Sequence, residues 1–494
     1  MTLALSEPHA TAILLAVFGL LMGFSVLLGR TLDRVGIPIV LLFLILGMLG
    51  GSEGLGGIAF DNYEVAFRIG TIALVLILFD GGLNTSLASI RRAAAPASLL
   101  ATAGVAFTAA ILAFCGRLLG LGWGEAILIG AIVSSTDAAA VFAVLRGGSL
   151  RVKARVRSAL EVESCINDPM AIILTFAVVE TLGGGAQPGL RLFFDVPLQL
   201  LIGAAVGIAT GYFARWILTH ATLATSGLYP VITHACGFLA FGLATLAQGS
   251  GILGVFAAAV VLGNGPLPYR AGLTRVHDAI AWLCQVSMFL MLGLLVYPSK
   301  LVPVAGVGLL LGLALAFVAR PLAASLCLIG FRWAPKEVLY VSWVGIRGAV
   351  PIILATFPVM AQLPGSDRIF HIVFFIVVVS ALVPGASILP LTRKLGLDDP
   401  EPPTPAAALE IHSLRKTNGE VHVYYVDPSV VVCGAKLADI DFPTGSAVIL
   451  IVRGSDLVAA RGGTTLQAGD HVYVFCRPED EPRIGLFFGK AIDA

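Results

Sequence analysis

Long apolar segments recur along the chain from residue 11 to about residue 396, and this recurrence limits the fold more than any other feature. They lie near residues 11–29, 37–51, 66–83, 94–116, 123–146, 158–181, 197–219, 229–247, 250–266, 276–297, 302–330, 337–360 and 369–392. About 20 apolar helical residues cross the hydrocarbon core of a bilayer. The sequence therefore predicts an all-α polytopic membrane protein with about 13 transmembrane helices.

Composition supports lipid as the solvent for most of the chain. Of 494 residues, 57% are hydrophobic and 12% are charged, whereas soluble domains carry about 25% charged residues. The net charge of +1 gives no electrostatic reason to expect a nucleic-acid partner. The seven cysteines form no CxxC pair, which argues against zinc ligation and a disulfide framework. Residues 1–10 contain no Lys or Arg, so we expect the first apolar segment to be a retained span rather than a signal peptide.

Loop charge gives an independent test of this span count. Loops after odd-numbered spans carry Arg30, Arg34, Arg91, Arg92, Arg146, Arg151, Lys153, Arg155, Arg157, Arg215, Arg270, Arg275, Arg332, Lys336, Arg393 and Lys394. Loops after even-numbered spans carry only Arg68, Arg117, Arg191, Lys300 and Arg368. Because positively charged loops stay in the cytoplasm, the N-terminus is predicted outside and the C-terminus inside.

The composition changes at about residue 397. Residues 1–396 are predicted to form the transmembrane domain, and the acidic, proline-rich residues 397–408 read as a linker. Short β-type runs then follow at 421–426, 447–452 and 471–475, separated by turn residues. Residues 409–494 are therefore predicted to form a small soluble α+β domain on the cytoplasmic side.

Several ionisable residues fall inside predicted spans, where charges are costly and commonly mark ion or proton pathways. Asp80 lies late in span 3, Asp137 in span 5, and Glu163 and Asp168 in span 6. Arg347 lies in span 12.

Spans 5 and 6 carry the candidate ion-binding residues. The hydroxyl residues Ser134–Thr136 precede Asp137, and a helix can break there because hydroxyls and freed carbonyls coordinate an ion. Span 6 adds Asn167 and Asp168, and Ser164 shares a helix face with Asp168. Carboxylate, amide and hydroxyl oxygens suit hard monovalent cations such as Na⁺ or K⁺. We therefore predict a monovalent cation site at Asp168, and expect no other cofactor.

Three of these acids also have purely structural interpretations. Asp137 suits a helix N-cap, Asp168 suits a cap at the kink before Pro169, and Asp80 before Gly81-Gly82 suits a place near the interface.

For the remaining two charged residues, Glu163 and Arg347, a structural role is favoured over ion binding. An unpaired Arg in lipid costs several kcal/mol, so Glu163 and Arg347 are predicted to form a structural ion pair. Arg320 sits near a span end before Pro321, where it can snorkel, and it is assigned no role.

A single carboxylate that binds either a proton or a cation predicts exchange of protons for cations. Desolvation penalises the anion of Asp168, so either a proton or a partly dehydrated cation neutralises it. If the site crosses the barrier only when occupied, the two guests compete. A single carboxylate beside the neutral Asn167 then predicts one proton exchanged for one cation, without net charge movement.

The motifs Thr136-Asp137, Glu163-Ser164-x-x-Asn167-Asp168 and Gly345-Ile346-Arg347-Gly348 resemble those of the monovalent cation:proton antiporter family of the NhaP type. The resemblance covers about residues 11–396. It implies an NhaA-like inverted repeat with broken crossing helices, a homodimer, and alternating access. It also implies that Asp168 is the proton/cation carboxylate, supported by Thr136, Ser164 and Asp137, and that Asp80 occupies an acidic position of the third helix.

The segment from Phe442 to Asp470 resembles a TrkA C-terminal (RCK-C) regulatory domain, which implies a small regulatory ligand. An antiporter core followed by such a domain is similar to bacterial potassium/proton antiporters of the cell-volume-regulation type. This similarity favours K⁺ over Na⁺ and implies the bacterial cytoplasmic membrane.

Two other classes of protein place acidic residues or regulatory domains in a similar context. A ligand-gated potassium channel would need a Thr-Val-Gly-Tyr-Gly type of filter, which the sequence lacks. An intramembrane aspartyl protease would usually show a Gly-x-Gly-Asp signature, and this is absent too. Without HExxH, GxSxG or P-loop lysine motifs, we expect no enzyme activity.

Overall fold

The computed structural model describes residues 12, 15–24, 27, 39–147, 150–184, 191–221, 225–399, 419–477, 479–489 and 491. The chain divides into two compact units, and the second unit comprises Pro400–Ala494 together with the short segment Pro268–Leu273, so that the main division falls after Asp399. This point lies inside the predicted linker 397–408, of which residues 400–408 lie outside the described residues, as do the first residues of the predicted soluble domain.

The first unit is helical. Its long helices are α3 (Tyr63–Leu83), α4 and α5 (Leu87–Leu99 and Val105–Leu118, joined by the π-helical turn η1, Leu100–Gly104), α8 (Ala154–Leu182), α9 (Arg191–His220), α10 (Leu228–Leu246), α12 (Arg270–Leu294), α13 and α14 (Pro298–Ala314 and Arg320–Leu328, joined by the π-helical turn η2, Leu315–Ala319), and α17 and α18 (Ser366–Ser380 and Ala386–Leu395, joined by the π-helical turn η4, Ala381–Gly385). Within the described residues, eight such helical segments are long and apolar enough to cross a membrane.

Shorter apolar helices complete this unit. They are Leu15–Phe24, α2 (Ile39–Gly50), α6 (Trp123–Ile132), α11 (Gly251–Gly263) and α16 (Ala349–Met360), accompanied by α7 (Ala138–Gly147), the 3₁₀ turn η3 (Ile329–Phe331) and α15 (Pro335–Trp343). Each predicted span coincides with helix in the described residues. Two of the predicted spans, 123–146 and 337–360, are interrupted at their centres.

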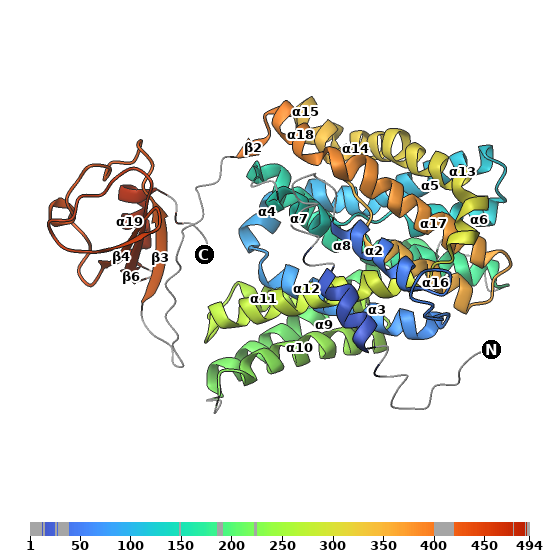
Figure 1. Ribbon diagram of the computed structural model, residues 1–494, viewed down its shortest axis with the longest axis horizontal. Coiled ribbons are helices and arrows are strands. Elements are labelled where there is room, and N and C mark those ends of the chain that lie inside the picture. The colour runs from blue at the N-terminus through green and yellow to red at the C-terminus, as the bar shows by residue number, and fades with distance from the viewer. Residues whose placement is uncertain are drawn as a thin grey trace. The chain divides into compact units, whose positions relative to one another are not determined.

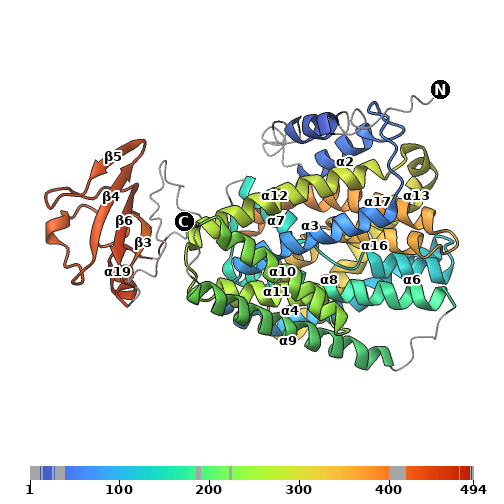
Figure 2. The ribbon, with the colours of Figure 1, turned by 90° about the horizontal axis from the view of Figure 1, so that it is seen from below.

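Helices α9, α10 and α11 pack side by side along one flank of this unit (Figures 1 and 2). Small residues set their spacing, because a Cβ at Gly207 of α9 would overlap the carbonyl of Gly254 on α11. Close backbone approach of this kind is typical of helices that associate in lipid. Only 17% of the apolar stretch Phe194–His220 is buried within the protein, as expected for a helix whose outer face meets lipid.

The second unit contains a four-stranded antiparallel sheet in the order β3-β6-β4-β5. Its strands are β3 (Glu420–Tyr425), β4 (Ala447–Arg453), β5 (Asp456–Ala459) and β6 (Asp470–Cys476), and the helix α19 (Glu481–Phe488) follows. Ile484 and Phe488 of α19 pack in one apolar core with Val472 and Val474 of β6. The predicted runs 421–426, 447–452 and 471–475 are thus confirmed as strands, and the additional 3₁₀ turn η5 spans Leu437–Asp439.

A separate two-stranded ladder closes the end of the first unit. Strand β1 (Arg151–Val152) lies between α7 and α8 and pairs antiparallel with β2 (Asp398–Asp399), which follows α18. The ladder continues with a hydrogen bond of 2.9 Å from the Lys153 amide to the Leu397 carbonyl. Leu397 is fully buried beside Val152 and Val156. The segment that leads to the second unit is therefore held at the α7–α8 connection.

Candidate ion-binding site

The first broken helix confirms the predicted interruption at Ser134–Thr136. Helix α6 ends at Ile132 and α7 begins at Ala138. The Ser134 hydroxyl donates to the Ala131 carbonyl at 2.7 Å, which satisfies one of the carbonyls that the helix end leaves free. A run of three hydroxyl residues therefore ends one half-helix and precedes the next.

A second broken helix crosses the first. Helix α15 ends at Trp343 and α16 begins at Ala349, although the sequence pattern predicted one continuous span over 337–360. The two breaks are joined by a backbone hydrogen bond of 2.8 Å from the Asp137 amide to the Ile346 carbonyl. A Cβ at Gly348 would overlap the Asp137 carboxylate. The pair Gly345 and Gly348 was the local signal that could have located this break, since only glycine allows so close an approach.

Opposite charges lie at the half-helix ends of the first break. The Arg347 Nε donates to the Val133 carbonyl, where α6 ends, at 3.0 Å. The Asp137 Oδ1 accepts from the Ala140 amide at 3.0 Å, where α7 begins. Cations stabilise helix C-termini and anions stabilise helix N-termini. Asp137 therefore has the N-cap geometry that was its structural interpretation, while it also lies at the crossing.

Helix α8 packs its candidate residues against this crossing. The Asn167 amide nitrogen donates to the Thr136 hydroxyl at 2.6 Å. The Ser164 hydroxyl donates to the Thr136 carbonyl at 3.0 Å and accepts from the Ala138 amide at 3.2 Å. The structure thus brings Thr136 together with Ser164 and Asn167, which lie 28 and 31 residues further along the chain.

Asp168 lies inside the protein next to this network. Its exposed fraction is 6%, and the Ser135 side chain lies close to its carboxylate. Within the part of the chain that the structure describes, no cationic side chain forms an ion pair with Asp168. The adjacent Asn167 Oδ1 is buried and lacks a hydrogen-bond partner there. A carboxylate and an orphaned amide oxygen are ligands of the kind that suit a hard alkali cation.

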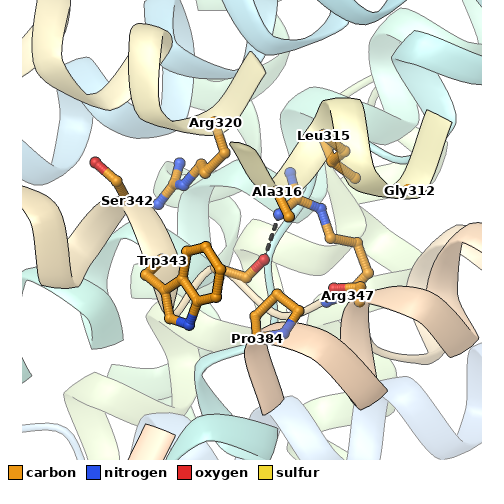
Figure 3. Close-up of a pocket in the computed structure, with 10 residues that line it drawn as sticks. Gly312, Leu315, Ala316, Arg320, Ser342, Trp343, Arg347 and Pro384 are labelled. Atoms are coloured by element: carbon orange, nitrogen blue, oxygen red, sulfur yellow. Dashed lines mark hydrogen bonds between the residues drawn. The ribbon is translucent and has the colours of Figure 1, made fainter. Parts of the chain in front are cut away.

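The predicted ion pair between Glu163 and Arg347 was wrong in its cation. The Arg320 Nη2 lies 2.6 Å from the Glu163 Oε1, and both side chains are almost fully buried. Arg347 donates instead to the carbonyls of Val133 and Gly345. Figure 3 shows Arg320 and Arg347 in the same small pocket.

Arg320 is therefore a residue whose role sequence reasoning missed. It stood near the predicted end of a span, which suggested that it could snorkel. In the structure the π-helical turn η2 immediately precedes it, and Arg320 begins α14 well inside the helical segment 298–331. A buried cation needs a buried anion, and that anion is Glu163, which the sequence had suggested as the partner of Arg347.

Asp80 lies in the last turn of α3 and is half-buried. Its Oδ1 accepts from the Asn84 amide nitrogen at 3.2 Å. Its part in a proton path stays a prediction. A cluster of three or more His, Cys, Asp or Glu side chains able to hold a metal is not found in the described ranges.

Two broken helices that cross beside a buried carboxylate are the arrangement of ion-coupled secondary transporters. Residues 14–394 match the family model described as "Sodium/hydrogen exchanger, transmembrane", and the chain belongs to this family. Residues 421–489 match the TrkA-C domain.

Named relatives extend over nearly the whole chain. It is 39% identical over 485 residues to the K(+)/H(+) antiporter NhaP of Alkalimonas amylolytica, covering 98% of this chain and 84% of that protein. It is 38% identical to the K(+)/H(+) antiporter NhaP2 of Shewanella oneidensis, covering 96% and 82%. Among solved structures, the sodium proton antiporter MjNhaP1 of Methanocaldococcus jannaschii at pH 8 superposes with a TM-score of 0.65 at 25% identity, covering 78% and 99%.

Proposed function

We propose that the protein exchanges K⁺ for H⁺ across the bacterial cytoplasmic membrane, with proton and cation competing for Asp168. The observation that carries this proposal is a buried carboxylate without a cationic partner among the described residues, beside an orphaned Asn167 oxygen at a crossing of broken helices. The K⁺/H⁺ antiporters named above support K⁺ as the cation.

The proposed cycle follows from the cost of an uncompensated charge inside the protein. When Asp168 is ionised and empty, its desolvated charge opposes movement of the site across the barrier. A proton or a cation removes this cost, and the two exclude each other because one carboxylate carries one charge. Thr136, Ser164 and Asn167 hold the site in shape, and Asp137 and Arg347 stabilise the broken ends. One proton is then exchanged for one cation, so that transport is electroneutral.

The proposed arrangement in the membrane uses all thirteen predicted spans. It counts the shorter helices and treats each broken pair, α6 with α7 and α15 with α16, as one span in an NhaA-like inverted repeat. The excess of Lys and Arg in the loops after odd-numbered spans supports an external N-terminus and a cytoplasmic C-terminal unit. We further propose a homodimer that alternates access, with Asp80 on the proton path and a small regulatory ligand on the TrkA-C domain.

The test is proton flux in proteoliposomes driven by gradients of K⁺, Na⁺ or Rb⁺. We expect K⁺-driven flux in the wild type, its loss in Asp168→Asn, and retention in Asp61→Asn, which makes the same chemical change at an exposed residue before α3. Exchange that persists in Asp168→Asn would refute the site. Flux that follows the membrane potential would refute electroneutrality.

Na⁺/H⁺ exchange at the same site is the second candidate function. The ligand set of carboxylate, amide and hydroxyl oxygens suits both ions, and the structurally similar MjNhaP1 is a sodium proton antiporter. Flux that is driven by Na⁺ but not by K⁺ would decide for this candidate.

A further inference from the structure

The short ladder of β1 and β2 joins the connection between α7 and α8 to the segment that leads into the second unit. Strand β1 lies in the connection between α7, which starts at the crossing, and α8, which carries Asp168. Strand β2 ends at Asp399, directly before the chain continues into the second unit. The register places Arg151 opposite Asp399 and Val152 opposite Asp398.

Two kinds of interaction hold the ladder in place. Leu397 has no exposed surface and packs with Val152 and Val156 in the apolar cluster that also contains Leu145 of α7. The register also places the oppositely charged residues Arg151 and Asp399 at directly opposed positions, and opposite charges at such positions favour an antiparallel ladder. Movement of β2 therefore moves the α7–α8 connection with it.

Helices α7 and α8 extend this effect to the ion site. The Ser164 hydroxyl donates to the Thr136 carbonyl and accepts from the Ala138 amide, so that α8 is hydrogen-bonded to the start of α7. Lys153 and Ser164 are eleven residues apart on α8, or about 16 Å along a helix. The α7–α8 hairpin thus has the site at one end and the ladder at the other.

We propose that the β1–β2 ladder couples the TrkA-C unit to the ion site, a step that rests on the antiport function proposed above. A ladder of two residue pairs has few hydrogen bonds and opens more easily than the helices around it. Paired and open forms are the two arrangements that coupling between distant sites requires. A change in the second unit that is transmitted along the chain reaches β2 as the first described element of the helical unit, and through β2 it affects the position of α8.

The test removes one hydrogen bond of the ladder in the full chain. Lys153 is the N-cap of α8 with φ −46°, which is close to the range of proline, so that Lys153→Pro removes the amide donor to Leu397 with little change of backbone. Lys153→Ala keeps the donor and is the matched control. The second unit is perturbed separately by Asp470→Asn, since Asp470 is fully buried and binds Arg453 through both carboxylate oxygens.

We expect Asp470→Asn to shift the K⁺ concentration for half-maximal proton flux by about fivefold, the lower range of allosteric couplings. The shift should persist in Lys153→Ala and vanish in Lys153→Pro. A shift of equal size in both backgrounds, or no shift with the ladder intact, would overturn the proposal. A wild type that exchanges no ion would instead refute the antiport function, and the role of the ladder with it.

A charge exchange keeps the proposal testable if Lys153→Pro does not fold. Arg151→Asp and Asp399→Arg each place like charges opposite one another, which opens the ladder, and the double variant restores the pair. We expect each single variant to weaken the response to Asp470→Asn and the double variant to recover it. A response that is unchanged in both single variants would overturn the coupling role.

Discussion

The two broken helices cross each other, yet their breaks have opposite chemistry. The first break, Ser134–Asp137, supplies hydroxyls and an acid, and its Thr136 contacts Ser164 and Asn167 of α8. The second break, Val344–Gly348, supplies glycines and a cation, and its Arg347 donates to backbone carbonyls. The first break therefore contacts the proposed ion site directly, whereas the second packs against the first.

The largest effect is expected from a side chain at Gly348, where the two broken helices approach each other closely. Gly348→Ala would place a Cβ against the Asp137 carboxylate. We expect K⁺-driven proton flux to fall to the level of empty liposomes. Gly306→Ala on α13, where a Cβ meets nothing within 4 Å, is the control and should transport normally. Normal flux in Gly348→Ala would show that the crossing tolerates separation.

A second prediction separates the two buried arginines. Arg320→Gln leaves the Glu163 carboxylate buried without its cation, which costs about 3–5 kcal/mol of unfolding free energy. Arg347→Gln removes two hydrogen bonds to backbone carbonyls, and a typical hydrogen bond contributes about 0.5–1.5 kcal/mol net. Thermal unfolding in detergent should rank Arg320→Gln as the less stable variant.

The double variant Arg320→Gln/Glu163→Gln extends this test. It removes both charges and should recover most of the stability lost in Arg320→Gln. If Arg347→Gln were the more damaging change, or if the double variant recovered nothing, the ion pair assigned to Glu163 would be incorrect.

A smaller effect is expected where α8 meets the first break. Ser164→Ala removes the donor to the Thr136 carbonyl and the acceptor for the Ala138 amide, at a cost of about 1 kcal/mol. Because this loosens the site without removing its charge, we expect a fewfold rise in the K⁺ concentration for half-maximal flux and an almost unchanged maximal rate. Ser89→Ala, outside the crossing, is the control. A lost maximal rate with unchanged K⁺ dependence would contradict a supporting role for Ser164.

The sequence predicted correctly those features that depend on local residue type alone. Apolar length located the helices, and three consecutive hydroxyls before Asp137 located the first break. It failed where the partner is far along the chain. Arg320 and Glu163 are separated by more than 150 residues, and no local pattern indicates which of two arginines the packing brings to the acid.

The family resemblance implied broken crossing helices, but the position of the second break and the ladder were missed, for related reasons. Gly345 and Gly348 stand in an apolar stretch whose composition suits a continuous helix, and only the Asp137 carboxylate shows why the glycines are needed. Strands β1 and β2 are two residues each, too short for any alternation of apolar and polar residues. The strands of the second unit are longer, and their alternation made three of them predictable.

The sheet of the second unit, like the membrane unit, buries a polar group without a partner in the described residues. Tyr424 on β3 is 1% exposed and its hydroxyl lacks a partner in the described part of the chain, while burial, followed by the nearby Cys476 and Glu481, raises its pKa to about 12. A tyrosine whose pKa is about 10 when unfolded then contributes stability that is complete below pH 10 and is lost as the pH rises towards 12. Tyr424→Phe removes both the unpaired hydroxyl and this titration.

We therefore expect Tyr424→Phe to raise the unfolding free energy of the second unit by about 1 kcal/mol at pH 7, and to weaken its loss of stability between pH 10 and pH 12. Hydrogen exchange of the β3 and β6 amides in the full chain measures both effects, since exchange reports the opening of each unit separately. Tyr473→Phe on the neighbouring strand is the comparison variant. A Tyr424→Phe protein that loses more than about 1 kcal/mol at pH 7 would show that the hydroxyl is bonded, because a satisfied buried hydroxyl costs stability when it is removed.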